Sequence, residues 1–281
     1  MTVFTHRRPA DTTEALALLI SHAARGDIVL RLDAEETAKH GLSAQPGVAL
    51  DAEAKDDVEL CIVLGGDGTI LRALQRYAGT DVPVFAINYG QIGFLATVEP
   101  DEIEDGIRRA FAKDFELMRL PGIVLELGGQ RHTAVNDIAI HRKVGERVAA
   151  LAYALDGEEA GSVRCDGLVV ATPAGSTGYN LANGGPVMAW GVEGLLVSFI
   201  APHSLTARSL VVAPQDGIRV RNRSREEPVE VNADGRPVCL LGPDEAVAAR
   251  FRDGVATLAQ THGASFYHRL REKFGRLASG V

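Results

Sequence analysis

Hydrophobic and polar positions follow two different periods along the first hundred residues of the chain. Val58–Leu64 and Val82–Asn88 are continuous apolar runs of strand length, whereas Ala15–Ala24 and Ile70–Tyr77 have helical spacing. A further short apolar run, Asp27–Leu32, follows the first helix. Buried strands that alternate with helices are typical of a parallel sheet with crossover helices. This part of the chain is therefore predicted to be a Rossmann-like α/β domain.

Acidic capping pairs mark the start of two predicted helices. Asp11 and Glu14 precede the helix that contains Ala15–Ala24. Asp101 and Glu104 precede a second helix, whose apolar face contains Ile103, Ile107, Ala110 and Phe111. The intervening segment Gly41–Asp57 has neither period and is expected to be a mobile loop.

The pattern changes from about Gly122 onward. Apolar runs of strand length follow one another, and Asp-Gly pairs typical of hairpin turns occur at positions 156, 216, 234 and 253. This pattern predicts a β-rich, β-sandwich-like domain. Phe266, Leu270, Phe274 and Leu277 then return to helical spacing, and we expect this C-terminal helix to pack on the first domain. The expected domains are residues 1–100 with 262–281, and residues 101–261.

Composition and charge narrow the class of function. Hydrophobic residues make up 46% of the chain, which is enough for a packed core, and the net charge of -8 argues against general binding to nucleic acid or anionic membranes. No stretch reaches the roughly 18 apolar residues of a membrane span, so a cytoplasmic location is expected. The three cysteines lack the spacing of a zinc site or a disulfide framework.

The candidate chemistry is concentrated in the segment Gly65–Thr69, with the sequence GGDGT, between a predicted strand and a predicted helix. Glycines there let the backbone approach a ligand, and free amides at a helix start hold phosphate oxygens. Asp67 would repel phosphate, but it suits a hydroxyl that is to be phosphorylated or a phosphate-bound metal. The alternative is a tight turn in which Asp67 caps a helix that begins near Thr69. The P-loop motif is absent, and Leu71 breaks the dinucleotide fingerprint.

This segment resembles the signature shared by NAD kinases, diacylglycerol kinases, sphingosine kinases and, more distantly, phosphofructokinases. Five further blocks, in the same order, are each similar to a block of NAD kinases. The second glycine-rich block, residues 166–186, is the most specific, because lipid kinases are not expected to carry it. The five blocks are NYGQIGFL (88–95), VNDIAIHR (135–142), DGLVVATPAGSTGYNLANGGP (166–186), APHSLTAR (201–208) and ADGRP (233–237). The resemblance implies transfer of a phosphoryl group to the 2′-hydroxyl of the adenosine ribose of NAD, which gives NADP. It also implies an α/β domain, a β-rich domain and a returning C-terminus.

The resemblance assigns roles to residues that match the family motifs. Asp67 becomes the candidate general base, and Asn136 and Asp137 become candidates for holding the NAD riboses and amide. Thr177 and Tyr179 match contacts to adenine and ribose. The remaining expected substrate- or nucleotide-binding residues are Gly66, Gly68, Thr69, Arg72, Asn88, Gly90, Phe94, Arg164, Asp166, Gly178 and Ala182.

Some positions leave alternatives open or depart from the family pattern. Asp166 resembles an aspartate near the nicotinamide amide, although Asp166-Gly167 could also form a hairpin turn. His203 is expected to be a partly buried structural histidine. Ala182 replaces a common serine, and Asn183 replaces a small alanine, so we expect this loop to be somewhat rearranged.

The resemblance also implies cofactors and partners. ATP, or alternatively polyphosphate, is the expected phosphoryl donor, and Mg²⁺ or another divalent cation is the expected cofactor, without a set of protein metal ligands in the sequence. A homodimer or homotetramer is expected. Two alternative functions remain at this stage: a lipid or sphingoid-type kinase that shares the GGDGT loop, and a catalytically silent NAD(P)-sensing protein.

Overall fold

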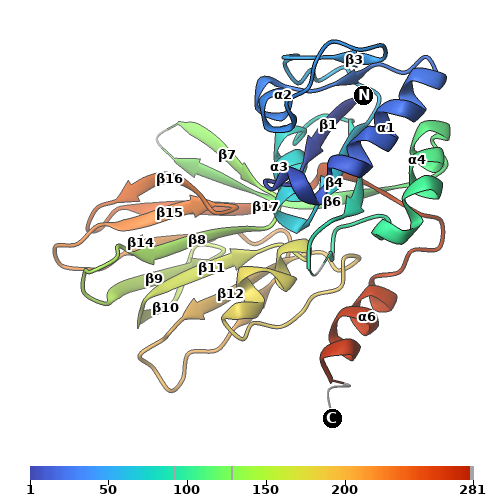
Figure 1. Cartoon of the computed structure of the whole chain (residues 1–281). Coiled ribbons are helices and arrows are strands. Elements are labelled where there is room, and N and C mark those ends of the chain that lie inside the picture. The colour runs from blue at the N-terminus through green and yellow to red at the C-terminus, as the bar shows by residue number, and fades with distance from the viewer. Residues whose placement is uncertain (92, 128, 279–281) are drawn as a thin grey trace. The chain divides into compact units, whose positions relative to one another are not determined.

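The computed structural model of the 281-residue chain describes residues 1–91, 93–127 and 129–278. Ile92, Gly128, residues 279–281 and the side chains of residues 276–278 lie outside the described part. The chain forms two compact units, residues 1–119 with 256–281 and residues 120–255, which we call unit 1 and unit 2. The blue-to-red colouring of Figure 1 shows that unit 1 combines the start of the chain with its C-terminal segment.

Unit 1 contains a parallel sheet, which confirms the predicted fold class of this part of the chain. Its strand order is β3-β2-β1-β4-β5-β17, and each neighbouring pair is parallel. The strands are β1 (Thr2–Thr5), β2 (Leu30–Arg31), β3 (Val48–Ala49), β4 (Cys61–Gly65), β5 (Pro83–Asn88) and the end of β17 (Ala246–Gln260). The helices are α1 (Thr13–Arg25), α2 (Ala34–His40), α3 (Asp67–Arg76), α4 (Ile103–Ala112) and α6 (Phe266–Ala278), with short 3₁₀ turns at Pro9–Asp11 and Pro100–Glu102.

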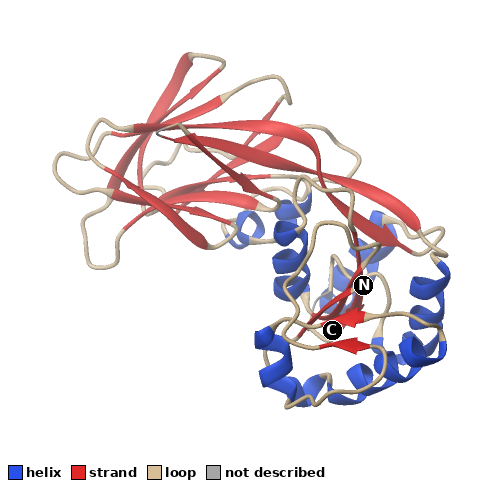
Figure 2. Ribbon diagram, turned by 90° about the horizontal axis from the view of Figure 1, so that it is seen from above, coloured by secondary structure: helices blue, strands red, loops and turns tan. Residues whose placement is uncertain are grey.

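Successive residues of a strand point to opposite faces of the sheet, and helices cover the side chains on both faces. Val3, Ile62 and Phe85 belong to one core cluster together with the buried residues of α1 and α4. Phe4, the neighbour of Val3, lies instead under the guanidinium of Arg72 on α3. Figure 2 shows helices around the strands of unit 1, whereas unit 2 consists almost entirely of strands. Because α4 shares the core of α1, the division of the chain lies after Arg119 rather than at residue 100.

The predicted helix starts were wrong in detail. Thr12 and Glu102 occupy the N-cap positions of α1 and α4, and neither side chain forms a capping hydrogen bond. Asp11 and Asp101 lie instead in the preceding 3₁₀ turns. Two proline-led turns thus contain the first residue of each expected capping pair, whereas Glu14 and Glu104 lie in the first turns of α1 and α4.

Unit 2 is built from antiparallel strands, as predicted. One sheet has the order β13-β12-β11-β8-β15-β16. A second set of strands, β10-β9-β14-β17, is extended by the β6-β7 hairpin, which pairs with β17. The first sheet comprises β8 (Asp137–Arg142), β11 (Gly167–Ala171), β12 (Leu195–Ile200), β13 (Leu210–Val212), β15 (Val229–Ala233) and β16 (Arg236–Leu241). The second set adds β6 (Glu116–Leu127), β7 (Gln130–Ala134), β9 (Ala149–Leu155), β10 (Glu158–Cys165) and β14 (Ile218–Asn222).

Unit 2 buries apolar side chains on both faces of its first sheet. Alternate residues of β8, β11 and β12 join residues of the second strand set in one large core cluster. The other face of the same strands packs around Met188, in the segment that follows the 3₁₀ turn η3 (Ala174–Thr177) and the short helix α5 (Tyr179–Ala182). Burial on both faces explains why β11 is apolar at every position.

The Asp-Gly pairs have three different outcomes. Asp156-Gly157 and Asp234-Gly235 form the predicted two-residue connections of the β9-β10 and β15-β16 hairpins. Asp216-Gly217 lies between β13 and β14, which belong to different sheets. Asp253-Gly254 was wrongly predicted as a turn, because both residues lie within the long strand β17.

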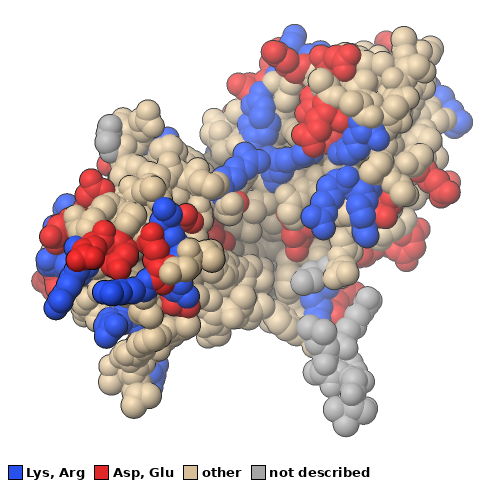
Figure 3. Space-filling model, turned by 60° about the vertical axis from the view of Figure 1, so that its left-hand side comes forward, with Lys and Arg blue, Asp and Glu red and all other residues tan. Residues whose placement is uncertain are grey.

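Charged side chains of both signs are present on the surface of the protein. On the face shown in Figure 3, Lys and Arg side chains are interspersed with Asp and Glu side chains on both units. Within residues 1–91, 93–127 and 129–278, every helix is too short or too polar to cross a lipid bilayer.

A buried carboxylate joins three elements of unit 1. Glu36 on α2 is fully buried and accepts hydrogen bonds from the amide and hydroxyl groups of Thr5, at the end of β1, at 3.1 and 2.6 Å. It also accepts a 2.7 Å bond from Arg72 on α3 and lies 2.7 Å from Lys39. A buried charge is tolerated only when it is paired and hydrogen-bonded in this way. Glu36 therefore fixes α2 and α3 at the carboxyl end of β1.

We predict that Glu36→Gln lowers the free energy of unfolding by about 3 kcal/mol, because it leaves two cations without their buried counter-charge. Glu35→Gln is the matched control: Glu35 also pairs with Arg72, at 3.0 Å, but its side chain is 67% exposed. Its loss should cost less than about 1 kcal/mol. Urea denaturation of both variants measures the difference, and equal losses would contradict the assigned role of Glu36.

Candidate functional site

The glycine-rich segment and the loop after β5 meet at the carboxyl edge of the parallel sheet. Gly65 pairs with Asn88 in the β4-β5 register, so Gly66 and Gly90 follow side by side. A Cβ atom built on Gly66 would lie 2.8 Å from the Cα atom of Gly90, closer than real Cβ contacts. Only glycine at these positions allows the two backbones to approach so closely.

Asp67 is fixed by the loop after β5. It opens the first turn of α3, but Gly66 is the N-cap residue, so the alternative in which Asp67 caps this helix was wrong. Its two carboxylate oxygens instead accept the backbone amides of Phe94, at 3.1 Å, and Leu95, at 3.0 Å. The carboxylate is half-buried. Two charge-assisted hydrogen bonds therefore set its orientation, and each oxygen keeps a lone pair for another donor.

A cavity of about 400 Å³ lies beside Asp67. Its lining combines the start of α3, from Gly66 to Thr69, with Thr5, His6 and Arg7 at the end of β1, and with Arg72. The first amides of a helix lack intrahelical partners and, with the helix dipole, favour anions. The exposed Arg7 adds a positive charge at the same opening. The cavity therefore combines the groups that bind phosphate with one fixed carboxylate.

The side chains of Arg72 and Asn88, two further predicted binding residues, are already paired with groups of the protein. Arg72 lines the cavity, but its guanidinium pairs with Glu35 and Glu36 and stacks over Phe4. Asn88 is 4% exposed; its Oδ1 atom accepts the Gly90 amide at 2.9 Å, and its Nδ2 atom donates to Glu99 at 2.9 Å. Both side chains thus support the loops around Asp67.

In unit 2, one aspartate holds the start of β8. The carboxylate of Asp234, which follows β15, accepts the backbone amides of Val135, Asn136 and Asp137 at 2.8, 2.7 and 3.0 Å. Asp234 also donates its own amide to the Asp137 carbonyl at 2.8 Å. The predicted pair Asn136-Asp137 therefore has a fixed backbone, from which both side chains project.

The second glycine-rich block closes around this pair. Thr172 donates its amide to the Asn136 carbonyl and its hydroxyl to the Val135 carbonyl, at 2.8 and 2.7 Å. A Cβ atom on Gly175 would lie 2.0 Å from the Asn136 carbonyl oxygen, so only glycine fits there. A Cβ atom on Gly178 would lie 3.9 Å from both Asn136 Nδ2 and Asp137 Oδ2. The block is therefore packed directly against the predicted pair.

The predicted residues around this pair differ in exposure. Thr177 is half-buried and donates its hydroxyl to the Ala174 carbonyl at 3.2 Å, while Tyr179 and Ala182 are exposed. Within the described part of the chain, the buried Oδ1 atom of Asn136 has no hydrogen-bond partner. A buried acceptor without a partner is costly and suits a ligand that brings a donor.

Burial gives Asp137 an unusual protonation equilibrium. The side chain is 7% exposed, and burial, together with the nearby charge of Asp234, raises its pKa to about 7. Burial also raises the pKa of the Tyr179 phenol, and the carboxylates of Asp137 and Asp166 raise it further. The Tyr179 hydroxyl therefore lies within electrostatic range of both acids.

Arg164 and Asp166 lie at the other end of β11. Asp166 precedes β11, whereas Asn136 and Asp137 lie beside its last residue, Ala171. The alternative of a hairpin turn at Asp166-Gly167 was wrong, because β10 and β11 belong to different sheets. Arg142 instead binds the Asp166 carboxylate at 2.6 Å through Nε and lowers its pKa by this hydrogen bond. The Arg164 side chain is exposed on β10.

His203 departs from the prediction of a partly buried histidine. Its side chain is exposed, and its backbone amide donates to the Arg164 carbonyl at 2.7 Å. The backbone rather than the imidazole holds this residue in place.

Several residues at these sites were missed by sequence reasoning. His6 and Arg7 follow β1, and the rule that carboxyl ends of parallel strands share one edge would have found them if that four-residue strand had been recognised. Asp234 was assigned to a turn and lies in the block ADGRP (233–237), but no role at the site was predicted for it. Thr172 carried no local signal, since its partners are 36 and 37 positions earlier.

We predict that Asp137 makes the stability of the fold depend on pH. Its folded pKa of about 7 lies above the ordinary value of 3.8. Between these values the folded state holds a proton that the unfolded state has released, so the free energy of unfolding falls as the pH rises. Each pKa unit corresponds to about 1.4 kcal/mol. Asp137→Asn should remove this part of the slope.

Urea denaturation at pH 4.5, 6 and 8 measures the effect. Asp253→Asn, at an exposed position of β17, is the matched control and should keep the wild-type slope. Identical slopes in the wild type and Asp137→Asn would show that Asp137 is ionised throughout this range.

Comparison with known proteins identifies the family. Residues 11–115 match the family model of the ATP-NAD kinase N-terminal domain, and residues 135–256 match that of the ATP-NAD kinase C-terminal domain. The NAD kinase of Symbiobacterium thermophilum is 34% identical over 277 residues, which cover 96% of each chain.

Solved structures agree with the fold. An NAD kinase from Archaeoglobus fulgidus, solved in complex with ATP, has a TM-score of 0.75 and 26% identity over 99% of both chains. The yeast NADH kinase complexed with NADH has a TM-score of 0.85 and 22% identity over 100% of this chain and 88% of that one, a likeness of fold alone. With both domain models matched in order and a third of its residues identical to those of a relative along nearly the whole chain, this protein belongs to the NAD kinase family.

Proposed function

We propose that the chain transfers the terminal phosphoryl group of ATP to the 2′-hydroxyl of the adenosine ribose of NAD, and that Asp67 is the general base. The observation that carries this proposal is the position of the Asp67 carboxylate. Two backbone amides hold it beside a cavity that is lined by the start of a helix and by Arg7, groups that suit phosphate. The matches to both domain models favour this acceptor over a lipid or sphingoid base.

The proposed step is a single displacement. The acceptor oxygen forms a bond to the terminal phosphorus of ATP, the bond from phosphorus to the bridging oxygen breaks, and ADP leaves. The hydroxyl proton passes to Asp67, which must come within hydrogen-bonding distance of the acceptor oxygen. Positioning and charge stabilisation supply most of the catalysis in such transfers. A carboxylate whose two oxygens are already oriented needs little reorganisation to accept that proton.

Donor binding is proposed for the cavity beside Asp67. The amide of Gly68 at the start of α3 and the side chain of Arg7 would bind phosphate oxygens, whereas the Thr69 amide already donates to the Gly66 carbonyl at 2.9 Å. Gly66 and Gly90 would let the backbone come close to the nucleotide. Arg72, already paired with two carboxylates, would act mainly by holding the cavity wall. Polyphosphate in place of ATP is the alternative donor for the same cavity.

NAD binding is proposed for the residues of unit 2. The unpartnered Asn136 Oδ1 atom and the Asp137 carboxylate suit ribose hydroxyls, and the exposed ring of Tyr179 suits a stacked base. Asp166 and Arg164 lie at the opposite end of β11, so a ligand that contacts them as well as Asn136 must be extended, as a dinucleotide is. Thr177, Gly178 and Ala182 would line the same face.

A divalent cation is expected with the triphosphate. Among the residues that the structure describes, no group of three His, Cys, Asp or Glu side chains is arranged to hold a metal ion. The described side chains therefore do not fit a protein cage for Mg²⁺, and the ion we expect with ATP would take its ligands mainly from phosphate and water oxygens.

We also propose a cytoplasmic location and a homodimer or homotetramer. Exposed apolar side chains of unit 2, among them Val144, Leu205 and Val211, support self-association. Light scattering coupled to gel filtration measures the mass in solution.

Asp67→Asn should lower kcat for NADP formation about 10²- to 10⁴-fold and change the Kd for NAD less than threefold. A coupled dehydrogenase assay with NAD, ATP and Mg²⁺ measures turnover, and calorimetry measures binding. Asp81→Asn, at a position 93% exposed, is the control and should leave turnover unchanged. Near-normal turnover in Asp67→Asn would exclude Asp67 as the base, and wild-type protein that binds NAD without turnover would support a sensor.

Arg7→Gln should raise the KM for ATP about three- to tenfold, which corresponds to roughly 0.6–1.4 kcal/mol. The neighbouring Arg8 pairs with Asp11 at 2.7 Å and is not among the residues that line the cavity, so Arg8→Gln is the matched control. Equal effects of the two variants would assign the loss to net charge rather than to a phosphate contact.

A further inference from the structure

The C-terminal helix α6 lies beyond both matched family segments, which end at residues 115 and 256, but it contacts the loop that holds Asp67. Arg269 on α6 is only 9% exposed. Its guanidinium donates to the backbone carbonyls of Phe94, at 2.9 Å, and Ala96, and to the side chain of Gln260. A buried guanidinium normally requires several such acceptors.

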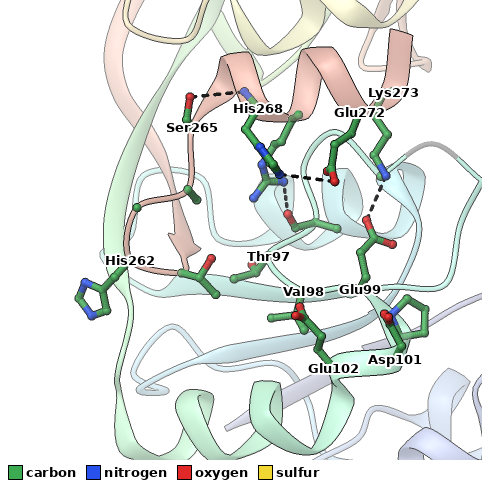
Figure 4. A pocket seen from close by; sticks show the side chains of 17 residues that line it. Thr97, Val98, Glu99, Asp101, Glu102, His262, Ser265, His268, Glu272 and Lys273 are labelled. Carbon is green, nitrogen blue, oxygen red and sulfur yellow. Dashed lines mark hydrogen bonds and ion pairs between the residues drawn. The ribbon is translucent and has the colours of Figure 1, made fainter. Parts of the chain in front are cut away.

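Two further contacts align α6 with the same loop. The rings of Phe94 and Phe274 pack with their centroids 5.7 Å apart. Lys273 donates to Glu99 at 3.0 Å, and Figure 4 shows the two side chains in direct contact. Both residues line a cavity of about 570 Å³. Glu99 in turn accepts a hydrogen bond from Asn88. The helix thus contacts the loop at Phe94 and Ala96 and again at Glu99.

One peptide group connects Arg269 to Asp67. The carbonyl of Phe94 and the amide of Leu95 belong to the same peptide bond; the carbonyl accepts from Arg269 and the amide donates to Asp67. Because a peptide group is planar and rigid, fixing its carbonyl also fixes the direction of its N–H. A cation at the carbonyl polarises the group and strengthens the hydrogen bond on its other side.

The electrostatics agree with this connection. Burial lowers the pKa of Arg269 to about 10, whereas the charges of Asp67, Glu99 and Glu272 act in the opposite direction. Arg269 therefore stays charged at neutral pH and interacts with Asp67 across the peptide.

We propose that Arg269 is a positioning residue, which orients the Asp67 carboxylate through the Phe94–Leu95 peptide. This inference rests on the proposed function of Asp67. It makes the C-terminal helix part of the catalytic arrangement, although Arg269 acts on the reaction only through Asp67.

Arg269→Gln should lower kcat about 10- to 100-fold, as expected when a catalytic group is misplaced by about 1 Å. The Kd for NAD should change less than threefold, since the proposed NAD contacts lie in unit 2. Arg269→Lys should retain more activity than Arg269→Gln, because one ammonium can still reach a carbonyl. Arg271→Gln is the matched control: Arg271 is exposed on the same helix, and its Nη2 atom lies 3.2 Å from His268 Nδ1.

A second experiment separates positioning from general stability. Arg269 lines the cavity of about 570 Å³, so guanidinium ions added at millimolar concentration can enter the space left by Arg269→Ala. Rescue of kcat by guanidinium, but not by ammonium at equal ionic strength, supports the proposal. A loss of activity that follows the loss of folded protein in circular dichroism, without rescue, would overturn it.

The double variant Asp67→Asn with Arg269→Gln separates the two proposals. If Arg269 acts through Asp67, the double variant should be no slower than Asp67→Asn alone. Multiplicative losses would contradict the inference and leave the role of Asp67 intact. High activity in Asp67→Asn would instead contradict the proposed function itself.

Discussion

Hydrogen bonds from backbone amides to a carboxylate determine the geometry of both candidate sites. Asp67 accepts two successive amides of the loop after β5, and Asp234 accepts three successive amides at the start of β8. In each case backbone N–H groups that have no partner in a helix or sheet donate to a carboxylate that is distant in the sequence. Phe94, Leu95, Val135 and Asn136 are therefore held without being part of a strand. The Oδ1 atom of Asn136 stays available to a ligand.

Buried charges in unit 1 also join whole helices to neighbouring strands and loops. Glu36 joins α2, α3 and the end of β1, whereas Arg269 joins α6 to the loop after β5. Each buried charge carries a desolvation cost, which is offset only when all its partners are in place. These contacts consequently specify one arrangement of the elements more sharply than apolar packing does, because an apolar contact tolerates small displacements.

Local sequence patterns predicted the longer strands and two hairpins of the fold. They did not predict the contacts that orient the candidate site. The apolar runs at β4 and β5 and the Asp-Gly hairpins at 156 and 234 depend on local patterns, and all were predictable. The short strands β1 to β3 have at most four residues and carry little periodicity. Asp67 was found from its glycine neighbours, but its partners Phe94 and Leu95 lie 27 and 28 positions away. The exposure of His203 likewise depends on how distant strands pack.

Unit 1 is discontinuous, since residues 256–260 complete its sheet only after the whole of unit 2 in the sequence. During synthesis, the edge of β5 stays without its partner β17 until unit 2 has emerged, and an open strand edge can pair with other chains. Arg269 on α6 is likewise synthesised only after unit 2. A partly synthesised chain would therefore contain both glycine-rich blocks but lack the helix that contacts the loop holding Asp67, so the support of Asp67 is completed only in a late step of synthesis.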